Sequence, residues 1–316
     1  MKTMIRFRVL VLTLLALALC SFLAGAQDMA VLASFKGTVI VTRESGQTLR
    51  VTGKEKLFPG DQVRTNSDGA ALIMYYTGKE VYLVANQNHL LAKAVREDGF
   101  FSRLGKVFSS ILWSKEPSKS VLGATSEFKE GKSIRGISPS FVVAKASDLK
   151  FTWIDTKSEP GSNYVVSVKN SDGTVVKSAA VKNASEVVMP LSDLKLTEKR
   201  QLQWHVLAMK TGQTSEETTF SVLSDSDMKL LQTDLSKVAD LCKGDPSVSR
   251  RALLEAMLYI DRNLFISAEA SLQKVVEAKP DLAVGHELLA NVYTKIGRTE
   301  QAEAEKKLAQ KLSVPQ

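Results

Sequence analysis

The chain has 316 residues, of which 44% are hydrophobic and 24% are charged. These proportions are those of folded globular domains, and they exclude a largely disordered or collagen-like chain. Basic residues outnumber acidic residues by 42 to 34, a net charge of +8, but no basic run is long enough to indicate a nucleic-acid-binding surface. We therefore expect two or three domains and no nucleic acid partner.

The first 26 residues have the pattern of a secretory signal peptide. A basic start is followed by the apolar run Val9–Leu19 and by Ala24-Gly25-Ala26, an A-x-A cleavage sequence. The apolar run is shorter than the ~20 residues that a membrane-spanning helix needs. An uncleaved anchor and a lipid on Cys20 are the alternatives. We predict cleavage after Ala26 and an exported protein, either periplasmic, associated with the outer envelope or secreted.

The stretch Lys56–Val84 predicts short strands joined by tight turns. Pro59-Gly60 is a turn dipeptide, and the carboxylate of Asp61 is expected to accept a nearby backbone N–H and lock that turn. A strand with alternating polar residues follows. Ala70–Tyr76 is apolar throughout, as in a strand covered on both faces. We predict that three strands form a compact β meander here.

This stretch and its flanks also carry a spaced motif. Its elements are Gly37-x-Val39, Leu57-x-x-Gly60-Asp61-x-Val63-x-Thr65, Gly78 and Val81-x-Leu83. Over Ala30–Lys93 the motif resembles the FecR-type domain, a β-rich extracytoplasmic module named after a bacterial signalling regulator. The resemblance implies sensing or scaffolding through protein contacts, with no catalytic residue. The regulator has a cytoplasmic tail and a membrane span before its domain, which the signal-like segment here does not match, so the resemblance does not extend to anti-sigma-factor activity.

The next segment, Phe100–Leu112, predicts an amphipathic helix. Its apolar residues recur at helical spacing, with Arg103 and Lys106 between them. We expect its apolar side to pack on the preceding β domain, and a membrane-surface helix is the alternative. We assign residues 28–115 to a FecR-like β domain with this trailing helix, and 116–136, rich in Ser, Lys and Gly, to a linker.

Seven short apolar runs after Pro139 predict a β-sandwich over residues 137–223. The runs are Phe141–Val143, Leu149–Trp153, Tyr164–Val168, Val175–Val176, Val187–Met189, Leu202–Val206 and Phe220–Val222. Asn170-Ser171-Asp172-Gly173 predicts a hairpin turn between two of them. Phe151-x-Trp153 and Leu202-x-Trp204-x-Val206 are similar to immunoglobulin and fibronectin type III domains. The similarity implies that Trp153 and Trp204 are core residues rather than sugar-stacking platforms.

From residue 226 to 314 the apolar spacing predicts five helices. They are Met228–Leu241, Ser247–Asp261, Leu264–Ala278, Asp281–Lys295 and Thr299–Lys311. Ala256 and Ala290 are 34 residues apart, as are two further pairs, Tyr259/Tyr293 and Ala268/Ala302. This period resembles the tetratricopeptide repeat, with the better match in the second copy and with the first helix capping the stack.

The resemblance to tetratricopeptide repeats implies a concave face that receives a peptide. It is lined by Arg250, Leu253, Met257, Ile260, Glu287, Asn291, Thr294 and Lys295. Asn291 stands where relatives clamp a peptide's terminal carboxylate, but Glu287 stands where they carry a lysine. We therefore expect an internal apolar segment as the ligand rather than a free C-terminus. The alternative is that the two repeats only cap or dimerise the chain.

No pattern in the sequence predicts a catalytic, cofactor or metal site. His89, His205 and His286 fall in three different predicted domains, and without the leader Cys242 is the only cysteine, which excludes an intramolecular disulfide. We expect a multidomain β-then-α protein, a non-catalytic envelope scaffold or sensor without cofactors. Its expected partners are other envelope proteins or peptides, and a cell-wall polymer is a further candidate. The alternative is a cell-wall or carbohydrate-active binding protein or hydrolase with an unrecognised site.

Overall fold

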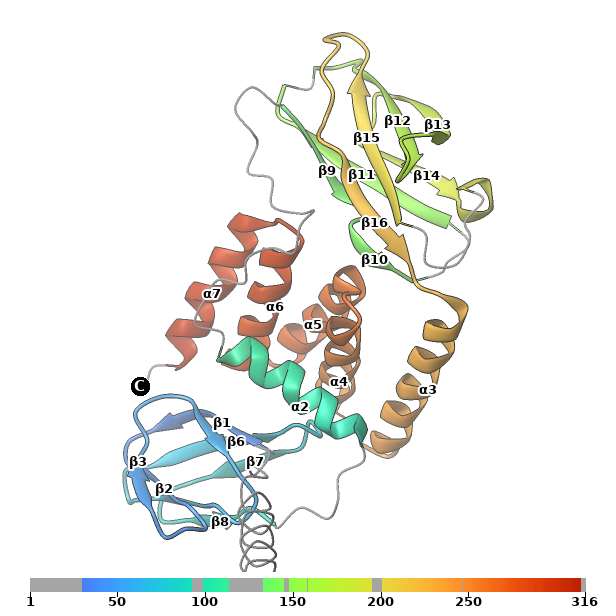
Figure 1. Ribbon diagram of the computed structural model, residues 1–316. Coiled ribbons are helices and arrows are strands. Elements are labelled where there is room, and N and C mark those ends of the chain that lie inside the picture. Colours follow the sequence, from blue (N-terminus) through green and yellow to red (C-terminus); the bar gives the residue numbers. More distant parts are fainter. Residues whose placement is uncertain are drawn as a thin grey trace, which may run out of the picture.

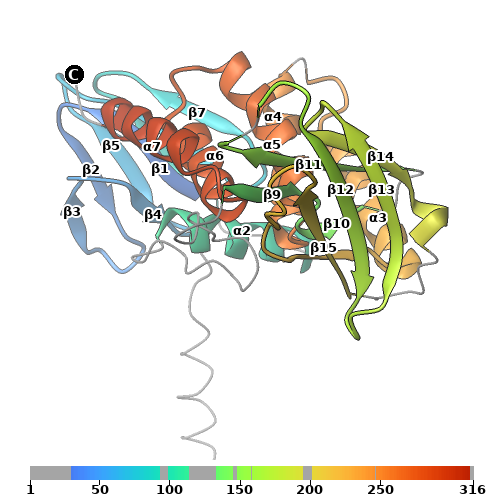
Figure 2. The same ribbon diagram turned by 90° about the horizontal axis from the view of Figure 1, so that it is seen from above.

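A computed structural model describes residues 30–92, 99–113, 133–144, 148–157, 159–194, 201–245 and 247–313. The predicted signal peptide, 1–26, lies outside these residues. The chain forms a small β domain, the helix α2 (Gly99–Leu112), a β-sandwich and then further helices, which lie between the two β domains (Figures 1 and 2). Within the described ranges, no helix combines the length and the apolar character needed to cross a membrane.

The N-terminal β domain contains two four-stranded sheets, in the orders β4-β1-β6-β7 and β3-β2-β5-β8. Its strands are β1 (Ala30–Lys36), β2 (Val39–Thr42), β3 (Thr48–Arg50), β4 (Glu55–Leu57), β5 (Gln62–Thr65), β6 (Ala70–Tyr75), β7 (Glu80–Leu83) and β8 (Asn88–Leu90). β5 pairs with β2 and β8, whereas β6 pairs with β1 and β7. The predicted meander of three consecutive strands is therefore wrong. The amide of Asn66 donates to the Thr38 carbonyl, and the turn that follows moves the chain from one sheet to the other.

Strand β6 is covered on both faces, as its continuous apolar run predicts. Ala71 and Ile73 belong to a core inside the β domain, together with Leu57. Leu72 and Met74 belong to a different core, which also contains side chains of α2 and of the C-terminal helices. One strand thus connects the interior of the β domain with the helical part of the chain.

The turn before β5 has the geometry that its sequence predicts. Gly60 has a φ of +84°, in the left-handed region that glycine adopts without strain. The Asp61 carboxylate, which is 2% exposed, accepts the backbone N–H of Phe58 at 2.8 Å and pairs with Arg43 at 2.5 Å. Both residues therefore have structural roles in the turn.

Replacing Gly60 by valine is expected to lower the free energy of unfolding by roughly 1–3 kcal/mol, because valine is strained at this φ. The new Cβ would also lie 3.0 Å from a carboxylate oxygen of Glu44. Gly46→Val is the matched control, since Gly46 has the same φ and open space around its Cβ position. Denaturant unfolding of both variants separates backbone strain from the Glu44 contact. An unchanged stability of Gly60→Val, together with lost binding of a partner, would instead make the turn a contact surface.

The second β domain is a sandwich of a five-stranded sheet, β10-β16-β15-β12-β13, and a three-stranded sheet, β14-β11-β9. Its elements are β9 (Ile134–Ser138), β10 (Phe141–Val143), β11 (Asp148–Asp155), β12 (Asn163–Asn170), β13 (Val175–Lys182), β14 (Glu186–Pro190), the 3-10 helix η1 (Leu191–Leu194), β15 (Gln201–Ala208) and β16 (Thr218–Val222). All seven predicted strands are confirmed. β9 is additional and begins inside the segment predicted as a linker, 116–136.

The two tryptophans of the sandwich are core residues, as predicted. Trp153 is 3% exposed and Trp204 is fully buried. The indole Nε1–H of Trp204 donates to the carbonyl of Pro139 at 2.7 Å, and its ring meets Phe151 edge to face. The predicted hairpin turn is also confirmed, since the amide of Gly173 donates to the Asn170 carbonyl at 3.0 Å.

The five predicted C-terminal helices are confirmed. They are α3 (Asp225–Leu241), α4 (Val248–Asp261), α5 (Phe265–Ala278), α6 (Ala283–Lys295) and α7 (Thr299–Ser313). Helix α4 pairs with α5 and α6 pairs with α7, while α3 packs on α4. Helix α2 contacts both α4 and α6, and it lies between these helices and the β domain (Figure 1).

Candidate partner-binding face

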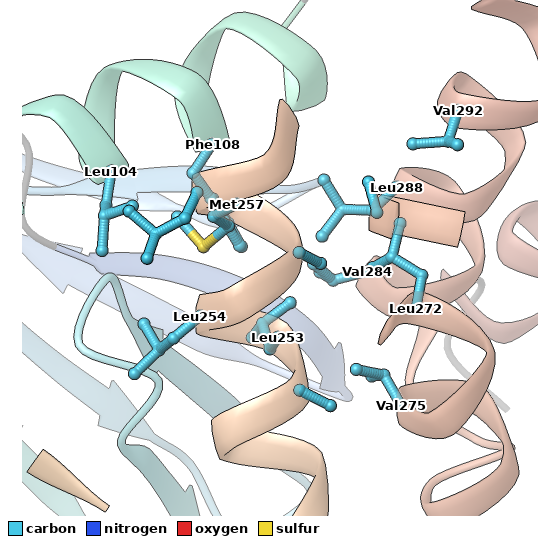
Figure 3. Close-up of a cluster of buried hydrophobic side chains, with 14 of the residues drawn as sticks. Leu104, Phe108, Leu253, Leu254, Met257, Leu272, Val275, Val284, Leu288 and Val292 are labelled. Atoms are coloured by element: carbon cyan, nitrogen blue, oxygen red, sulfur yellow. The ribbon is translucent and has the colours of Figure 1, made fainter. Parts of the chain in front are cut away.

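Helices α4 and α6 supply all eight residues of the predicted peptide-binding face, and α2 packs across both helices. Figure 3 shows Leu104 and Phe108 of α2 directed toward Met257 of α4. Leu253 and Met257 are only 2% and 1% exposed. Both residues therefore lie in the core of the chain, and Met257 is covered by the chain's own amphipathic helix.

The site in which α2 packs, called its seat below, is formed by the β domain as well as by the helices. The buried residues of α2 are Phe100, Leu104, Gly105, Phe108 and Leu112. The Phe108 ring lies 5.3 Å from that of Tyr76, the residue after β6, and the Tyr76 hydroxyl lies 3.0 Å from that of Ser109. A Cβ on Gly105 would come within 2.8 Å of the Tyr76 ring, so glycine is required for this close approach. The helix packs on the β domain as predicted, and on α4 and α6 as well.

A buried carboxylate fixes α2 to the helices. Asp234 of α3 is 6% exposed, and its Oδ2 accepts Arg103 of α2 at 2.7 Å and Arg262, at the end of α4, at 2.5 Å. Burial alone would raise the pKa of Asp234, but hydrogen bonds to the two guanidinium groups outweigh it and hold the pKa below its ordinary value. Asp234 is therefore charged at neutral pH, and its single charge joins three helices.

Charged residues of the predicted face also contact the β domain. Glu287 of α6 forms an ion pair with Lys54, which precedes β4. The Nε–H of Arg250 donates to the Thr77 carbonyl at 3.1 Å, and Nη1 of the same residue pairs with Asp245 at 2.9 Å. We expected Glu287 to repel the carboxylate of a ligand, but its charge is neutralised within the chain by the ion pair with Lys54.

Besides Arg250 and Glu287, four residues of the predicted face keep part of their surface exposed: Ile260, Asn291, Thr294 and Lys295. Ile260 packs against the core of the helices, and the Thr294 hydroxyl donates to the Ala290 carbonyl within α6 at 2.9 Å. Burial lowers the pKa of Lys295. Asn291 and Lys295 are four residues apart and so lie on one side of α6. This pair presents partly exposed polar side chains on α6.

The ionic residues that join the parts of the chain were not predicted from the sequence. A signal for Asp234 was present, because it falls in helical phase with the buried Leu231 and Val238 of α3, where an acidic residue needs a partner. The pair between Lys279 and Glu80 had no such signal. Nothing in the sequence relates a strand residue to a helix residue so far along the chain.

The three histidines lie in separate surroundings, as predicted. His89 meets the Tyr75 hydroxyl at 2.8 Å, and the two ring nitrogens of His286 face Glu305 at 2.6 Å and the Pro280 carbonyl at 2.9 Å. Burial, with a smaller effect of Lys169, lowers the pKa of His205. Among the residues with described positions, no group of three His, Cys, Asp or Glu side chains is arranged to hold a metal ion.

No protein-family model and no curated protein matches the chain. Among solved structures, it is similar to chicken CNTN1 FN1-FN3 domains, with 10% identity over 63% of this chain and 64% of that chain and a TM-score of 0.21. It is similar to the BSP domain of a biofilm associated protein, with 12% identity over 63% of this chain and 28% of that chain and a TM-score of 0.21. A myokine structure is 18% identical over 28% of this chain and 96% of that chain, with a TM-score of 0.23. The order of its own strands and helices makes the chain a multidomain β-then-α protein, with sandwich-like sheets followed by C-terminal helices.

Proposed function

We propose that this protein is an exported, non-catalytic interaction scaffold of the bacterial cell envelope. In this proposal a FecR-type β domain and a pair of tetratricopeptide-like repeats are held together through α2, and a fibronectin-like sandwich extends from them. The partners are other envelope proteins, bound through the surfaces of these domains.

The FecR-type assignment is supported by the structural use of its motif residues. Gly60 takes the positive φ of the turn, and Asp61 closes it. Thr65 is 1% exposed, and its hydroxyl lies 2.5 Å from the Val84 carbonyl, which ties β5 to the loop before β8. Residues that hold a frame together are what a binding domain without catalytic residues requires.

The tetratricopeptide-like assignment is supported by the helix pairs α4–α5 and α6–α7 and by the small residues at their repeat positions. Ala256 and Ala268 are fully buried, while Ala290 and Ala302 are 7% and 5% exposed. Small side chains let paired helices approach closely. Both copies place alanine at equivalent points, as a repeat built by stacking requires.

The observation that carries the non-catalytic role is the use of the buried carboxylates. Asp61 pairs with Arg43, Asp234 with Arg103 and Arg262, and Glu269 of α5 with Arg298 before α7. Each pair joins two elements of the fold. Burial raises the pKa of Glu269, although the nearby Arg298 opposes the shift. These groups stabilise contacts between elements instead of facing a substrate.

Export is tested by the intact mass of the protein isolated from the envelope fraction of a bacterial host. We expect the mass of residues 27–316, because the leader has the pattern of a cleaved signal peptide. A mass that includes residues 1–26, or the additional mass of a lipid on Cys20, would contradict this prediction.

Partner binding is tested by crosslinking in intact cells, followed by pull-down of the tagged protein. The double variant Asn291→Ala and Lys295→Ala is expected to lose at least one partner, because it changes the accessible part of the face and leaves the core intact. Asp substitutions at Leu253 or Met257 are unsuitable, since both side chains are buried on α4, the helix on which α2, α3 and α5 all pack, and a charge there would unfold the helical part of the chain. The double variant Gln232→Ala and Lys229→Ala on the exposed side of α3 is the control. If the Asn291/Lys295 variant folds and retains every partner, this face is not the binding site.

A further inference from the structure

We propose that α2 is a displaceable occupant of the face formed by α4, α6 and the β domain, and that a partner's amphipathic helix takes the same seat when α2 leaves. This inference rests on the proposed function, because it names the class of ligand that the scaffold binds. It also assigns α2 a second role, as an internal competitor that keeps the face closed.

The seat has the chemistry of a helix-binding groove. Its floor is apolar and includes Met257 of α4, and Figure 3 shows the side chains of Leu104 and Phe108 beside this residue. Its edge carries the carboxylate of Asp234, which receives Arg103 at 2.7 Å, and the ammonium group of Lys237, which lies 5.3 Å from the centre of the Phe100 ring. An apolar floor with a buried carboxylate at its edge fits an amphipathic helix that carries a basic residue beside its apolar stripe.

The sequence of α2 defines the ligand more closely. Large apolar residues stand at every fourth position, Phe100, Leu104, Phe108 and Leu112, and a basic residue, Arg103, stands just before the second of them. The position after Leu104 must be small, because a Cβ there would come within 2.8 Å of the Tyr76 ring. We therefore expect a partner helix with apolar residues at i, i+4, i+8 and i+12, a basic residue at i+3, and glycine at i+5.

Covalent attachment gives α2 a large advantage over a free helix. A tethered segment competes with an effective concentration on the order of millimolar for short connections. A free helix of identical sequence will therefore bind the unmodified chain weakly and will bind strongly once α2 is prevented from docking. This difference is the measurable signature of an exchangeable seat.

The first test uses the full mature chain and a fluorescent peptide of residues 99–112. The chain variant Leu104→Asp with Phe108→Asp is expected to bind the peptide at least tenfold more tightly than the wild-type chain does. A chain with Ser110→Asp, a charge added on the exposed side of α2, is the control and should bind as weakly as wild type. A folded double variant that binds the peptide no better than wild type would overturn the proposal.

A second peptide tests whether the seat is the one that α2 occupies. Gly105→Ala raises the helix propensity of the free peptide but places a methyl group against Tyr76. We expect this peptide to bind the double variant at least tenfold more weakly than the wild-type peptide, although it is more helical in solution. Equal or tighter binding of the Gly105→Ala peptide would show that the peptide sits elsewhere and would overturn the assignment.

Because the double variant loses two core side chains, a measurement on the wild-type chain tests the proposal independently of whether the variant folds. In native-state hydrogen exchange, the amides of α2 are expected to exchange at least tenfold faster than those of α4 and α6, because α2 opens without global unfolding. Equal protection of all three helices would make α2 a permanent core helix and would overturn the proposal. None of these measurements needs an envelope partner, so their failure leaves the scaffold proposal standing, and a failed pull-down leaves them unaffected.

Discussion

Replacing Phe108 by alanine is expected to lower the free energy of unfolding by about 3–5 kcal/mol, the usual cost of removing a fully buried aromatic side chain. Phe108 is completely buried, and it belongs to the core that contains Leu72 and Met74 of β6 as well as Leu253 and Met257 of α4. The cavity left by the substitution would open at the junction of the β domain, α2 and the C-terminal helices.

The important part of this result is which domains are affected. We expect the β domain and the helices to lose stability together, because one core contains side chains of both. The sandwich has a separate core around Trp204 and Phe151, and its unfolding transition should not move. Two transitions are therefore expected by calorimetry, although the sequence alone predicts three separate units over 28–115, 137–223 and 226–314.

The matched control is Phe101→Ala, which removes the same atoms from the neighbouring position of α2. Phe101 is only half-buried, so the loss should be clearly smaller. Hydrogen exchange or domain-specific fluorescence on both variants identifies the domain that responds. Destabilisation of the helices by Phe108→Ala, with an unchanged β domain, would show that the two parts fold independently and that their shared core contributes little.

Local patterns predicted the strands and helices of this fold well, because buried apolar residues recur in the sequence at the period of the strand or helix. The unbroken apolar run of β6 correctly indicated a strand covered on both faces, and the helical spacing after residue 226 gave all five helices. The β meander was wrong because pairing depends on contacts distant in sequence. The turn at Asn66 and Gly69 has the composition of a hairpin turn. It connects two different sheets instead, and the backbone hydrogen bond from the Asn66 amide to the Thr38 carbonyl holds it there.

The candidate face illustrates a second limit of sequence reasoning. The resemblance to tetratricopeptide repeats placed Leu253 and Met257 on a face open to a ligand, whereas both side chains are buried, because the resemblance does not say what else in the chain covers that face. The amphipathic pattern of α2 likewise identified an apolar stripe without its second partner. Two apolar surfaces of one chain tend to bury each other when the connection permits it. An amphipathic helix beside a repeat array is therefore a candidate occupant of that array.

Replacing Asp234 by asparagine is expected to destabilise the same shared body by about 2–4 kcal/mol. The substitution keeps the shape of the side chain and removes the charge that Arg103 and Arg262 share. Arg262 is the more costly of the two to leave unpaired, since its side chain is only 12% exposed. Asp240→Asn, at an exposed position of the same helix, is the control and should change stability by less than about 0.5 kcal/mol.

The pH dependence separates the charge of Asp234 from its packing. Its pKa is lower in the folded chain than the ordinary value of 3.8, so the folded state favours the ionised form. The stability that this ionisation provides is fully present above that ordinary value, and it is lost as the pH falls through the lower pKa of the folded state. The stability difference between wild type and Asp234→Asn should therefore be constant from about pH 5 to 8 and shrink below about pH 4. A difference that stays constant in acid would mean that the ionisation of Asp234 does not contribute to stability, and the ionic connection of α2 to α3 and α4 would then not be what holds the helix in its seat.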